Sequence, residues 1–408
     1  MISKRCYGLL LSLNLLGKMP KNLVALLTIL VFFAVVIEAC TKDDGGNNIA
    51  PVVSQSVQTG TASPAVSNPI TNDTAIVGQA LFWDPILSGG KDVACATCHH
   101  PNNAYTDGLD LSLGPNAVGY GYNRRFLKPN DVTVTKRNTQ TILNAAFNGM
   151  DVGGKYVSST APMFWDSRTQ SLEKQAASPM MTFEEMRGHA FSEAVTLDSL
   201  VARLTNIPEY RQLFKTAFGS PQAITAVNIG KAIAAFERTL VAMNAPYDRY
   251  QKGNKTVFTD GQLKGMQLFK DEGCPICHSG PMFSDYQLHV LSVPDNSQLT
   301  SSDAGAGGTY AFRTPSLRNV ELTAPYMHNG VFQTLKQVMK FYDDIGEPIS
   351  QNPHVPVQQL DPKLQRIALG AVEQDQLISF LNALTDPDFD KTVPVHVPSG
   401  LKPGGNIR

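Results

Sequence analysis

The chain has 408 residues and a formal net charge of −1, with 42% hydrophobic and 17% charged residues. This length and composition are sufficient for two globular domains of ordinary size. The near-zero net charge gives no indication of a nucleic-acid partner, because proteins that bind nucleic acids carry clustered positive charge.

The first 40 residues have the pattern of an export signal. Lys18 and Lys21 precede an apolar run over residues 23–36, and Cys40 follows the run. This order predicts a signal peptide over residues 1–40, with Cys40 as the lipidated first residue of the mature protein. Met19 is an alternative to Met1 as the start. An ordinary cleaved signal and an uncleaved anchor stay open, although the run is short for a membrane span of about 20 residues.

Two segments have neither helical nor strand periodicity. Residues 41–73 are rich in Gly, Asn, Ser, Thr and Pro, which predicts a flexible tether. Residues 387–408 are rich in Pro and Gly, which predicts a tail that is unstructured or wrapped on the surface. Residues 41–44 resemble an export tag of surface lipoproteins. We therefore expect a protein of the periplasm or cell envelope, with a lipid anchor in the outer membrane.

A C-x-x-C-H motif occurs twice and uses four of the six cysteines. The two copies read Cys95-Ala-Thr-Cys98-His99 and Cys274-Pro-Ile-Cys277-His278. The motif attaches haem c through both thiols, and its histidine becomes an axial ligand of the iron. Zinc sites built from Cys-x-x-Cys pairs normally close within a few tens of residues, and thioredoxin-like pairs need no such histidine. The sequence therefore predicts two covalently bound haem c groups and redox chemistry.

Between the tether and the tail, the apolar pattern is mainly helical. Apolar residues recur at helical spacing over residues 197–204 and 229–240. Thr259 and Gln262 form a capping box for a helix that leads to the second motif. We expect a mainly α fold with two cytochrome c-like haem domains packed together and little β structure. The expected domains are residues 74–245 and 246–386.

Several sequence blocks resemble the bacterial di-haem cytochrome c peroxidase / MauG family and occur in the family's order. They are residues 81–88, 137–144, 164–168, 171–175, 312–319 and 325–330. The resemblance implies an enzyme that reduces hydrogen peroxide to water with electrons from a small donor protein such as a cytochrome. It also implies that the first haem, with His99 as proximal ligand, reacts with peroxide. The second haem, with His278, takes in electrons.

The sixth position of the first iron is predicted to be open. Some family members block this position with a histidine, but the corresponding loop here, residues 105–125, contains none. His100 is too close to His99 to reach the opposite haem face. The resemblance makes Glu173 the catalytic acid/base, with a pKa raised by an apolar haem face. The alternative is a solvated helix residue beside Lys174.

Two positions near this site depart from the family pattern. Met163 stands where the family often has glutamine, and Ser167 stands where it usually has glycine. Met163 cannot supply the hydrogen bonds of an amide, so we expect a less polar pocket. This predicts slower peroxide turnover or a different substrate.

The sixth ligand of the second iron is expected from residues 327–342. The resemblance places Tyr342 at the position where the peroxidases have methionine and MauG has tyrosine. An anionic phenolate stabilises ferric iron, whereas a thioether raises the potential. Met339 is the rival ligand and Met327 a remoter one. A buried core aromatic is the structural alternative for Tyr342.

The resemblance also implies a calcium ion between the domains. Its ligands match the side chain of Asn138 and the backbone carbonyls of Thr323 and Pro325, oxygen donors that suit a hard cation. Many members have a tryptophan between the haems. The two tryptophans, Trp83 and Trp165, both lie inside other family blocks. The sequence therefore does not assign this bridge, and Tyr156 is named only as a guess.

The sequence therefore predicts an exported di-haem c-type peroxidase. One alternative is MauG-like oxidation of a protein or small-molecule substrate. Another is a di-haem electron carrier with no substrate at iron. A homodimer stays open, and the sequence does not identify the electron donor.

Overall fold

The computed structural model describes residues 72–407 apart from 346–348 and 365–366. The expected signal peptide, Cys40 and almost all of the tether lie outside the described residues. The described part is mostly helical with little sheet, which confirms the expected fold class. Within it, every helix is too short or too polar to cross a membrane.

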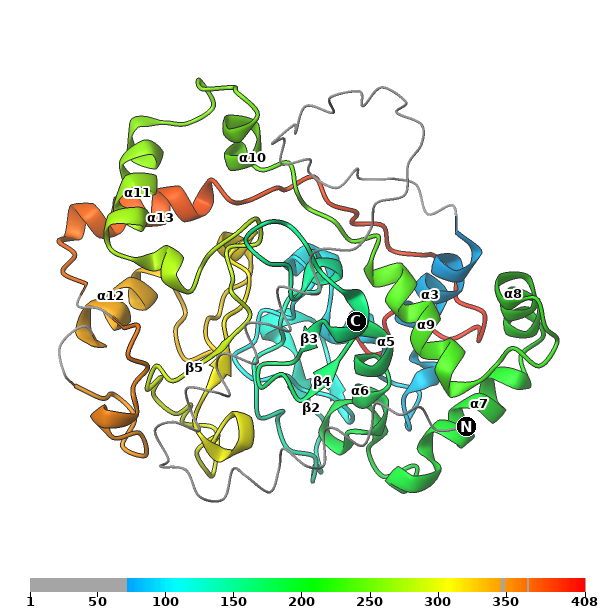
Figure 1. Cartoon of the computed structure of the whole chain (residues 1–408). Helices are drawn as coiled ribbons and strands as arrows, with labels where there is room; N and C mark the ends of the chain where they lie inside the picture. Colours follow the sequence, from blue (N-terminus) through cyan, green and yellow to red (C-terminus); the bar gives the residue numbers. More distant parts are fainter. Residues whose placement is uncertain (1–71, 346–348, 365–366, 408) are drawn as a thin grey trace, which may run out of the picture. The chain divides into compact units, whose positions relative to one another are not determined.

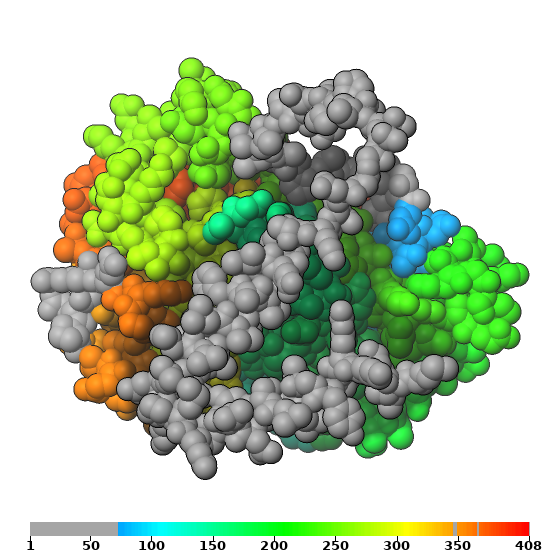
Figure 2. Space-filling view, viewed as in Figure 1, coloured from blue at the N-terminus to red at the C-terminus, as the bar shows by residue number. Residues whose placement is uncertain are grey.

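The longer helices are α3 (Asp73–Trp83), α7 (Thr196–Thr205), α8 (Pro208–Phe218), α9 (Ala226–Glu237), α11 (Asp260–Asp271), α12 (Leu335–Ile345) and α13 (Ala371–Asn382). The shorter ones are α4 (Cys95–Cys98), α5 (Leu172–Gln175), α6 (Ser178–Met181) and α10 (Pro246–Gln251). Figure 1 shows α3, α7, α8 and α9 on one side of the view and α10 to α13 on the other. The same two groups lie at opposite sides of the space-filling view in Figure 2.

The strands are two residues long and pair as three antiparallel ribbons in the described residues. They are β1 (Ala117–Val118) with β2 (Arg125–Phe126), β3 (Pro162–Met163) with β4 (Thr169–Gln170), and β5 (Leu288–His289) with β6 (Phe312–Arg313). Such short ribbons hold loops in place and do not form a core. The β3–β4 ribbon holds the segment that contains Met163 and Trp165.

Local sequence explains where the main helices begin. The Asn72 side chain accepts a hydrogen bond from the Thr74 backbone N–H and caps α3. Thr225 caps α9 in the same way, and Thr259 forms the predicted capping box with Gln262 at the start of α11. These caps satisfy backbone donors that the first helical turn leaves unpaired.

Each half of the described chain is built around one crossing of two helices at a glycine. In the first half α3 packs against α9, and a Cβ on Gly78 would overlap the carbonyl oxygen of Ala232. In the second half α11 packs against α13, and a Cβ on Gly265 would overlap the carbonyl oxygen of Gln376. Only glycine allows the backbones to approach this closely. In the second half, α11 leads directly into the second C-x-x-C-H motif; in the first half, residues 84–94 separate α3 from the first motif.

The C-terminal segment after α13 returns to the first half of the chain. The carbonyl of Gly404 accepts a hydrogen bond of 2.8 Å from Thr97 Oγ1, inside the first motif, and its N–H donates to the Trp83 carbonyl. Ser399 Oγ donates to Asp84, and Val397 is fully buried. This segment is wrapped on the first half and is ordered by these contacts.

Candidate active site

The first C-x-x-C-H motif lies at the wall of a cavity of about 530 Å³. Cys95 and Cys98 form the ends of α4, and neither forms a disulfide. His99 follows the helix, and its Nδ1 lies 3.1 Å from the carbonyl oxygen of Tyr105. An Nδ1–H that donates to this carbonyl leaves Nε2 free as an iron ligand, as metal-binding histidines require. Burial lowers the pKa of His99, which favours the neutral ligand form.

The second motif repeats this arrangement at a separate cavity of about 220 Å³. Cys274 and Cys277 form no disulfide, and His278 Nδ1 lies 3.2 Å from the Phe283 carbonyl oxygen. Burial lowers the pKa of His278 to about 4. The donor set therefore fits haem c at both places: two thiols, a neutral histidine held through Nδ1, and an adjacent cavity.

The described lining of the first cavity contains one histidine, His99. His100 is buried away from it, with its ring 5.6 Å from that of Trp83 and 4.5 Å from that of Tyr120, measured between centroids. The described loop thus offers no second histidine to the iron.

Glu173 does not line the first cavity, although its neighbours Leu172 and Gln175 do. Its carboxylate lies 2.6 Å from Arg238, and about a third of each side chain is exposed. Partial burial alone would raise the pKa of Glu173, but hydrogen bonds from the backbone and from Arg238 hold it below its usual value. The expectation of a raised pKa is wrong in this structure, because the sequence does not reveal the distant arginine.

Three glutamates that sequence reasoning missed, Glu184, Glu185 and Glu237, do line the first cavity. Glu237, the last residue of α9, is 5% exposed, and burial raises its pKa to about 8. Burial and the neighbouring Glu184 raise the pKa of Glu185 to about 7. No local motif marks these residues, because their burial depends on helices that meet only in the folded chain.

Met163 lines the first cavity beside an amide from another segment. Asn148 Nδ2 lies 3.4 Å from the Pro162 carbonyl oxygen and 3.5 Å from Met163 Sδ. Asn148 also lines the cavity. The cavity therefore has a carboxamide next to Met163, although the sequence position itself supplies a thioether.

The second cavity is lined by Tyr342, Met339 and Met327. Burial raises the pKa of the Tyr342 phenol, and the nearby thiols of Cys274 and Cys277 add to the rise. The structure thus brings all three expected ligand candidates to one cavity.

His289 also lines the second cavity and is held by two aspartates. Its Nδ1 lies 2.6 Å from Asp361, and its Nε2 lies 3.0 Å from Asp285. Cys277 lies close to His289 and Asp285 in a group that could hold a metal ion. A thioether bond to haem would occupy the Cys277 sulfur, so we do not assign a separate metal site here.

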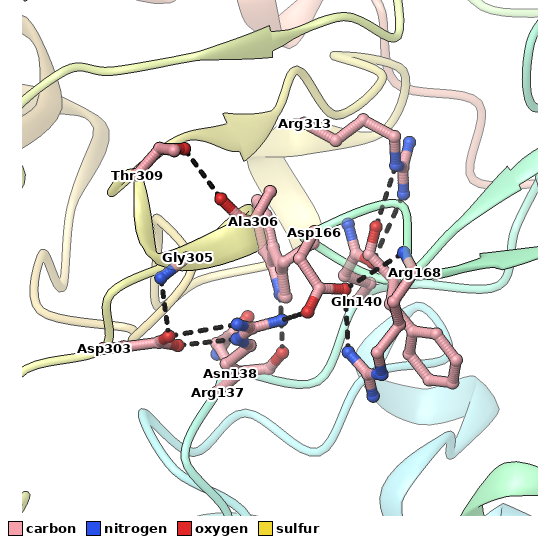
Figure 3. A network of polar contacts seen from close by, with 12 residues as sticks. Arg137, Asn138, Gln140, Asp166, Arg168, Asp303, Gly305, Ala306, Thr309 and Arg313 are labelled. Carbon is pink, nitrogen blue, oxygen red and sulfur yellow. Dashed lines mark hydrogen bonds and ion pairs between the residues drawn. The ribbon is translucent and has the colours of Figure 1, made fainter.

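Trp165 and Arg313 line both cavities and so lie in the wall between them. Trp165 Nε1 donates to the Asn138 carbonyl at 3.0 Å. Arg313 is 4% exposed and donates to the Phe164 carbonyl and to Gln140 (Figure 3). Tyr156, the guess taken from the sequence, is exposed and lines neither cavity.

An ion-pair network beside this wall joins the two halves of the chain. Figure 3 shows Arg137 between Asp166 and Asp303, with Arg168 on the far side of Asp166. Arg137 lies 2.7 Å from Asp166 and 2.6 Å from Asp303. Asp303 also accepts a hydrogen bond from the Gly305 backbone N–H. The network links the residues before and after the second motif.

The three expected calcium ligands, Asn138, Thr323 and Pro325, all line the first cavity. Asn138 Nδ2 donates to the Leu109 carbonyl at 2.8 Å. This hydrogen bond orients the amide and leaves its Oδ1 as the atom available to a cation.

Fold and cavities together define a mainly helical protein with two haem c sites. The chain is 33% identical to the methylamine utilization protein MauG of Methylophilus methylotrophus, over 78% of this chain and 84% of that protein. The chain belongs to the bacterial di-haem cytochrome c peroxidase / MauG family. The family profile described as di-haem cytochrome c peroxidase matches residues 72–256.

Other similar proteins support this family assignment. The chain is 30% identical to the cytochrome c551 peroxidase of Nitrosomonas europaea, over 81% of this chain and 85% of that protein. A MauG-like protein associated with microbial copper homeostasis has a similar structure, with a TM-score of 0.64, 25% identity and coverage of 81% and 95%. The di-haem peroxidase BthA of Burkholderia thailandensis has a TM-score of 0.60 at 21% identity, over 79% of this chain and 87% of that one, and shows the shared fold.

Proposed function

We propose that this protein reduces hydrogen peroxide to water at the first cavity, with electrons that enter through the second from a small cytochrome-like donor. The difference between the two cavities carries the proposal. The described lining of the first has a single histidine and several carboxyl groups, whereas Tyr342 and Met339 line only the second. The first suits a reacting ligand and the second suits electron transfer.

Haem c, when bound, supplies the electrons that break the peroxide bond. Cys95 and Cys98 would attach the first group and His99 would ligate it, while Cys274, Cys277 and His278 would do the same for the second. Arg313 has no carboxylate partner among the described residues, and burial lowers its pKa to about 10. A haem propionate in the wall would give this guanidinium a paired anion.

We assign the first proton transfer to Glu173. Glu173 does not itself line the cavity, but its neighbours Leu172 and Gln175 do, and Arg238 keeps its carboxylate ionised, so it is placed to accept the proton that peroxide releases there. Asn148 can donate a hydrogen bond to peroxide in place of the amide that Met163 lacks. Such positioned acid/base groups commonly accelerate a reaction by about 10²–10⁴-fold.

Optical and EPR spectra of the ferric protein, with and without peroxide, test the function directly. We expect one haem with an open sixth position that responds to peroxide, and rapid oxidation of a reduced small cytochrome. Two six-coordinate low-spin haems with no response would instead indicate an electron carrier.

A MauG-like oxidase is the second candidate, because Tyr342 lines the second cavity and MauG is a relative. A phenolate ligand makes the second iron a poor acceptor from high-potential donors. Slow cytochrome oxidation, together with peroxide-dependent oxidation of an added protein or small molecule, would favour this candidate.

We further propose one calcium ion at Asn138, Thr323 and Pro325. Their oxygen atoms are donors that calcium prefers. Removal of calcium by a chelator should slow electron transfer between the haems and leave both haems attached. Added calcium, but not added potassium, should restore the rate.

We also propose that Cys40 carries a lipid that anchors the protein in the outer membrane. The sequence before Cys40 supports this proposal. Cys40→Ser should move the protein from the membrane fraction to the soluble periplasmic fraction.

A further inference from the structure

Glu237 is a buried carboxyl group at the first cavity. The proposed peroxide reduction has so far given it no role. It is 5% exposed and lines the cavity, and its Oε2 has no hydrogen-bond partner in the described structure. Nearly all buried polar atoms in proteins are paired, and exceptions gather at functional sites. An unpaired carboxyl oxygen at a cavity wall is therefore a candidate for chemistry.

The position of Glu237 next to Glu173 follows from the packing of α5 on α9. A Cβ on Gly230 would overlap the carbonyl oxygen of Glu173, so α5 lies directly on α9 at this point. Glu237 follows Gly230 by seven residues, or two turns, and so shares this face of α9. One helix face thus presents Glu237 to the cavity and receives the element that carries Glu173.

The charged and titratable groups around Glu237 come from three elements. They are Cys95 at the start of α4, Glu173 on α5 and Arg238 directly after α9. The Arg238 guanidinium is already bound to Glu173 at 2.6 Å, so it only partly offsets the burial of Glu237. The partly exposed carboxyl group of Glu173 is therefore ionised, while the buried carboxyl group of Glu237 keeps its proton at neutral pH.

We propose that Glu237 is the inner proton donor of the first cavity and is recharged from solvent through Glu173. The inference rests on the proposed peroxide reduction. Reduction of one hydrogen peroxide to two waters breaks the O–O bond, forms two O–H bonds, and consumes two electrons and two protons. The electrons come from the donor protein. Glu237 gives one proton to the leaving oxygen and, once recharged through Glu173, delivers the remaining protons that complete the second water.

The return of Glu237 to its protonated form follows from its surroundings. A buried carboxylate without a cation of its own is strongly basic, because burial disfavours the charged form. It therefore takes up a proton again. Glu173 is partly exposed, so it can take that proton from water and pass it inward.

Glu237→Gln in the full-length, haem-loaded protein tests the inference. Glutamine keeps the shape of the side chain and removes the transferable proton. Glu193→Gln is the matched control, because Glu193 is an exposed glutamate. Mass and absorbance establish that both variants carry two haems.

The first measurement is the infrared spectrum at neutral pH. We expect the carbonyl stretch of a protonated carboxyl group, shifted in heavy water, in the wild type and the Glu193 variant but not in Glu237→Gln. Persistence of the same band in Glu237→Gln would overturn the inference, because Glu237 would then not hold the proton.

The second measurement is the rate of the peroxide reaction against pH. We expect Glu237→Gln to react about 10²-fold more slowly and to lose the decline of the wild-type rate near pH 8. An unchanged rate and pH profile in Glu237→Gln would overturn the inference while wild-type turnover upholds the proposed function. Absence of turnover in the wild type would overturn both, and the infrared band would still show whether Glu237 is protonated.

A Glu237→Asp variant covers the case in which Glu237→Gln does not take up haem. It keeps a carboxyl group on a shorter side chain. We expect it to retain the infrared band and to react at an intermediate rate. Loss of the band with a wild-type rate would contradict the proposed role.

Discussion

At the level of single residues, the carboxyl group of Glu237 at the first cavity and that of Glu173 beside it differ in charge. Arg238 pairs with Glu173 and lowers its pKa, whereas burial without a dedicated cation raises that of Glu237. Acid and base assignments at active sites commonly follow from environments that push two pKa values apart. The pair can therefore divide proton acceptance and proton donation between them.

Glu173→Gln should slow peroxide reduction about 10²-fold or more and leave both haems attached. A residue that only holds Arg238 would give a small effect, because glutamine can still accept a hydrogen bond from the guanidinium. Stopped-flow rates with haem content as the control measure this difference. An unchanged rate would remove Glu173 from the mechanism.

Arg238→Gln should change the pH dependence of the same reaction. The folded pKa of Glu173 is depressed, so its ionised form is present at neutral pH and is lost as the pH falls through that value. Without the arginine, this acidic limb should move to higher pH. A pH–rate profile measures this shift. An acidic limb that stays at the same pH would show that a group other than Glu173 controls it.

Tyr342→Phe should alter the low-spin spectrum of the second haem, whereas Met339→Leu should not. The reason is that a phenolate ligand is lost only in the first variant. EPR spectra of both ferric variants make the comparison. A methionine-to-iron charge-transfer band in the wild type would instead assign the ligand to Met339.

At the level of elements, the two glycine crossings position both motifs. Each crossing brings two helices close together, and one helix of each pair precedes a C-x-x-C-H motif in the chain. The N-terminal cap of α11 was predicted from the sequence, because a cap depends on neighbours within three or four residues; the structure adds caps of the same local kind at α3 and α9. The two helix crossings could not be predicted from the sequence, because they join residues more than 100 positions apart.

Gly265→Ala should destabilise the second half by about 1–3 kcal/mol, because the new methyl group meets the Gln376 carbonyl. Gly261→Ala on the same helix is the control. A Cβ there meets only ordinary van der Waals contacts, so the variant should be neutral or more stable by up to about 1 kcal/mol. Denaturant unfolding followed through the absorbance of the second haem measures both. Equal stabilities would show that the helices separate at little cost.

At the level of the whole molecule, the C-terminal segment and the ion-pair network tie distant parts of the chain together. The segment after α13 bonds to Thr97 in the first motif and to Asp84 before it. Arg137 joins Asp166 and Asp303 beside the wall between the cavities (Figure 3). Stability of the first site therefore depends on the last residues of the chain.

A truncation after Pro387 should lower the stability of the first half by about 3 kcal/mol or more, because several hydrogen bonds of about 1 kcal/mol each are lost. The spectrum of the second haem should change little. Thermal unfolding followed at each haem separates the two effects. Val395→Ser, at a fully exposed position of the same segment, is the control and should have no effect. A truncated protein with wild-type stability would show that the segment is dispensable.

The sequence by itself determined the two haem motifs, their axial histidines and the mainly helical class, because these depend on residues close together in the chain. It also marked Glu173, Tyr342 and the calcium ligands as candidates through family blocks. Only the tertiary structure decided that Glu173 is ionised, that Glu237 holds the raised pKa, and that Trp165 and Arg313 lie between the cavities. These properties come from burial and from charges on distant elements, and local sequence patterns carry no record of either.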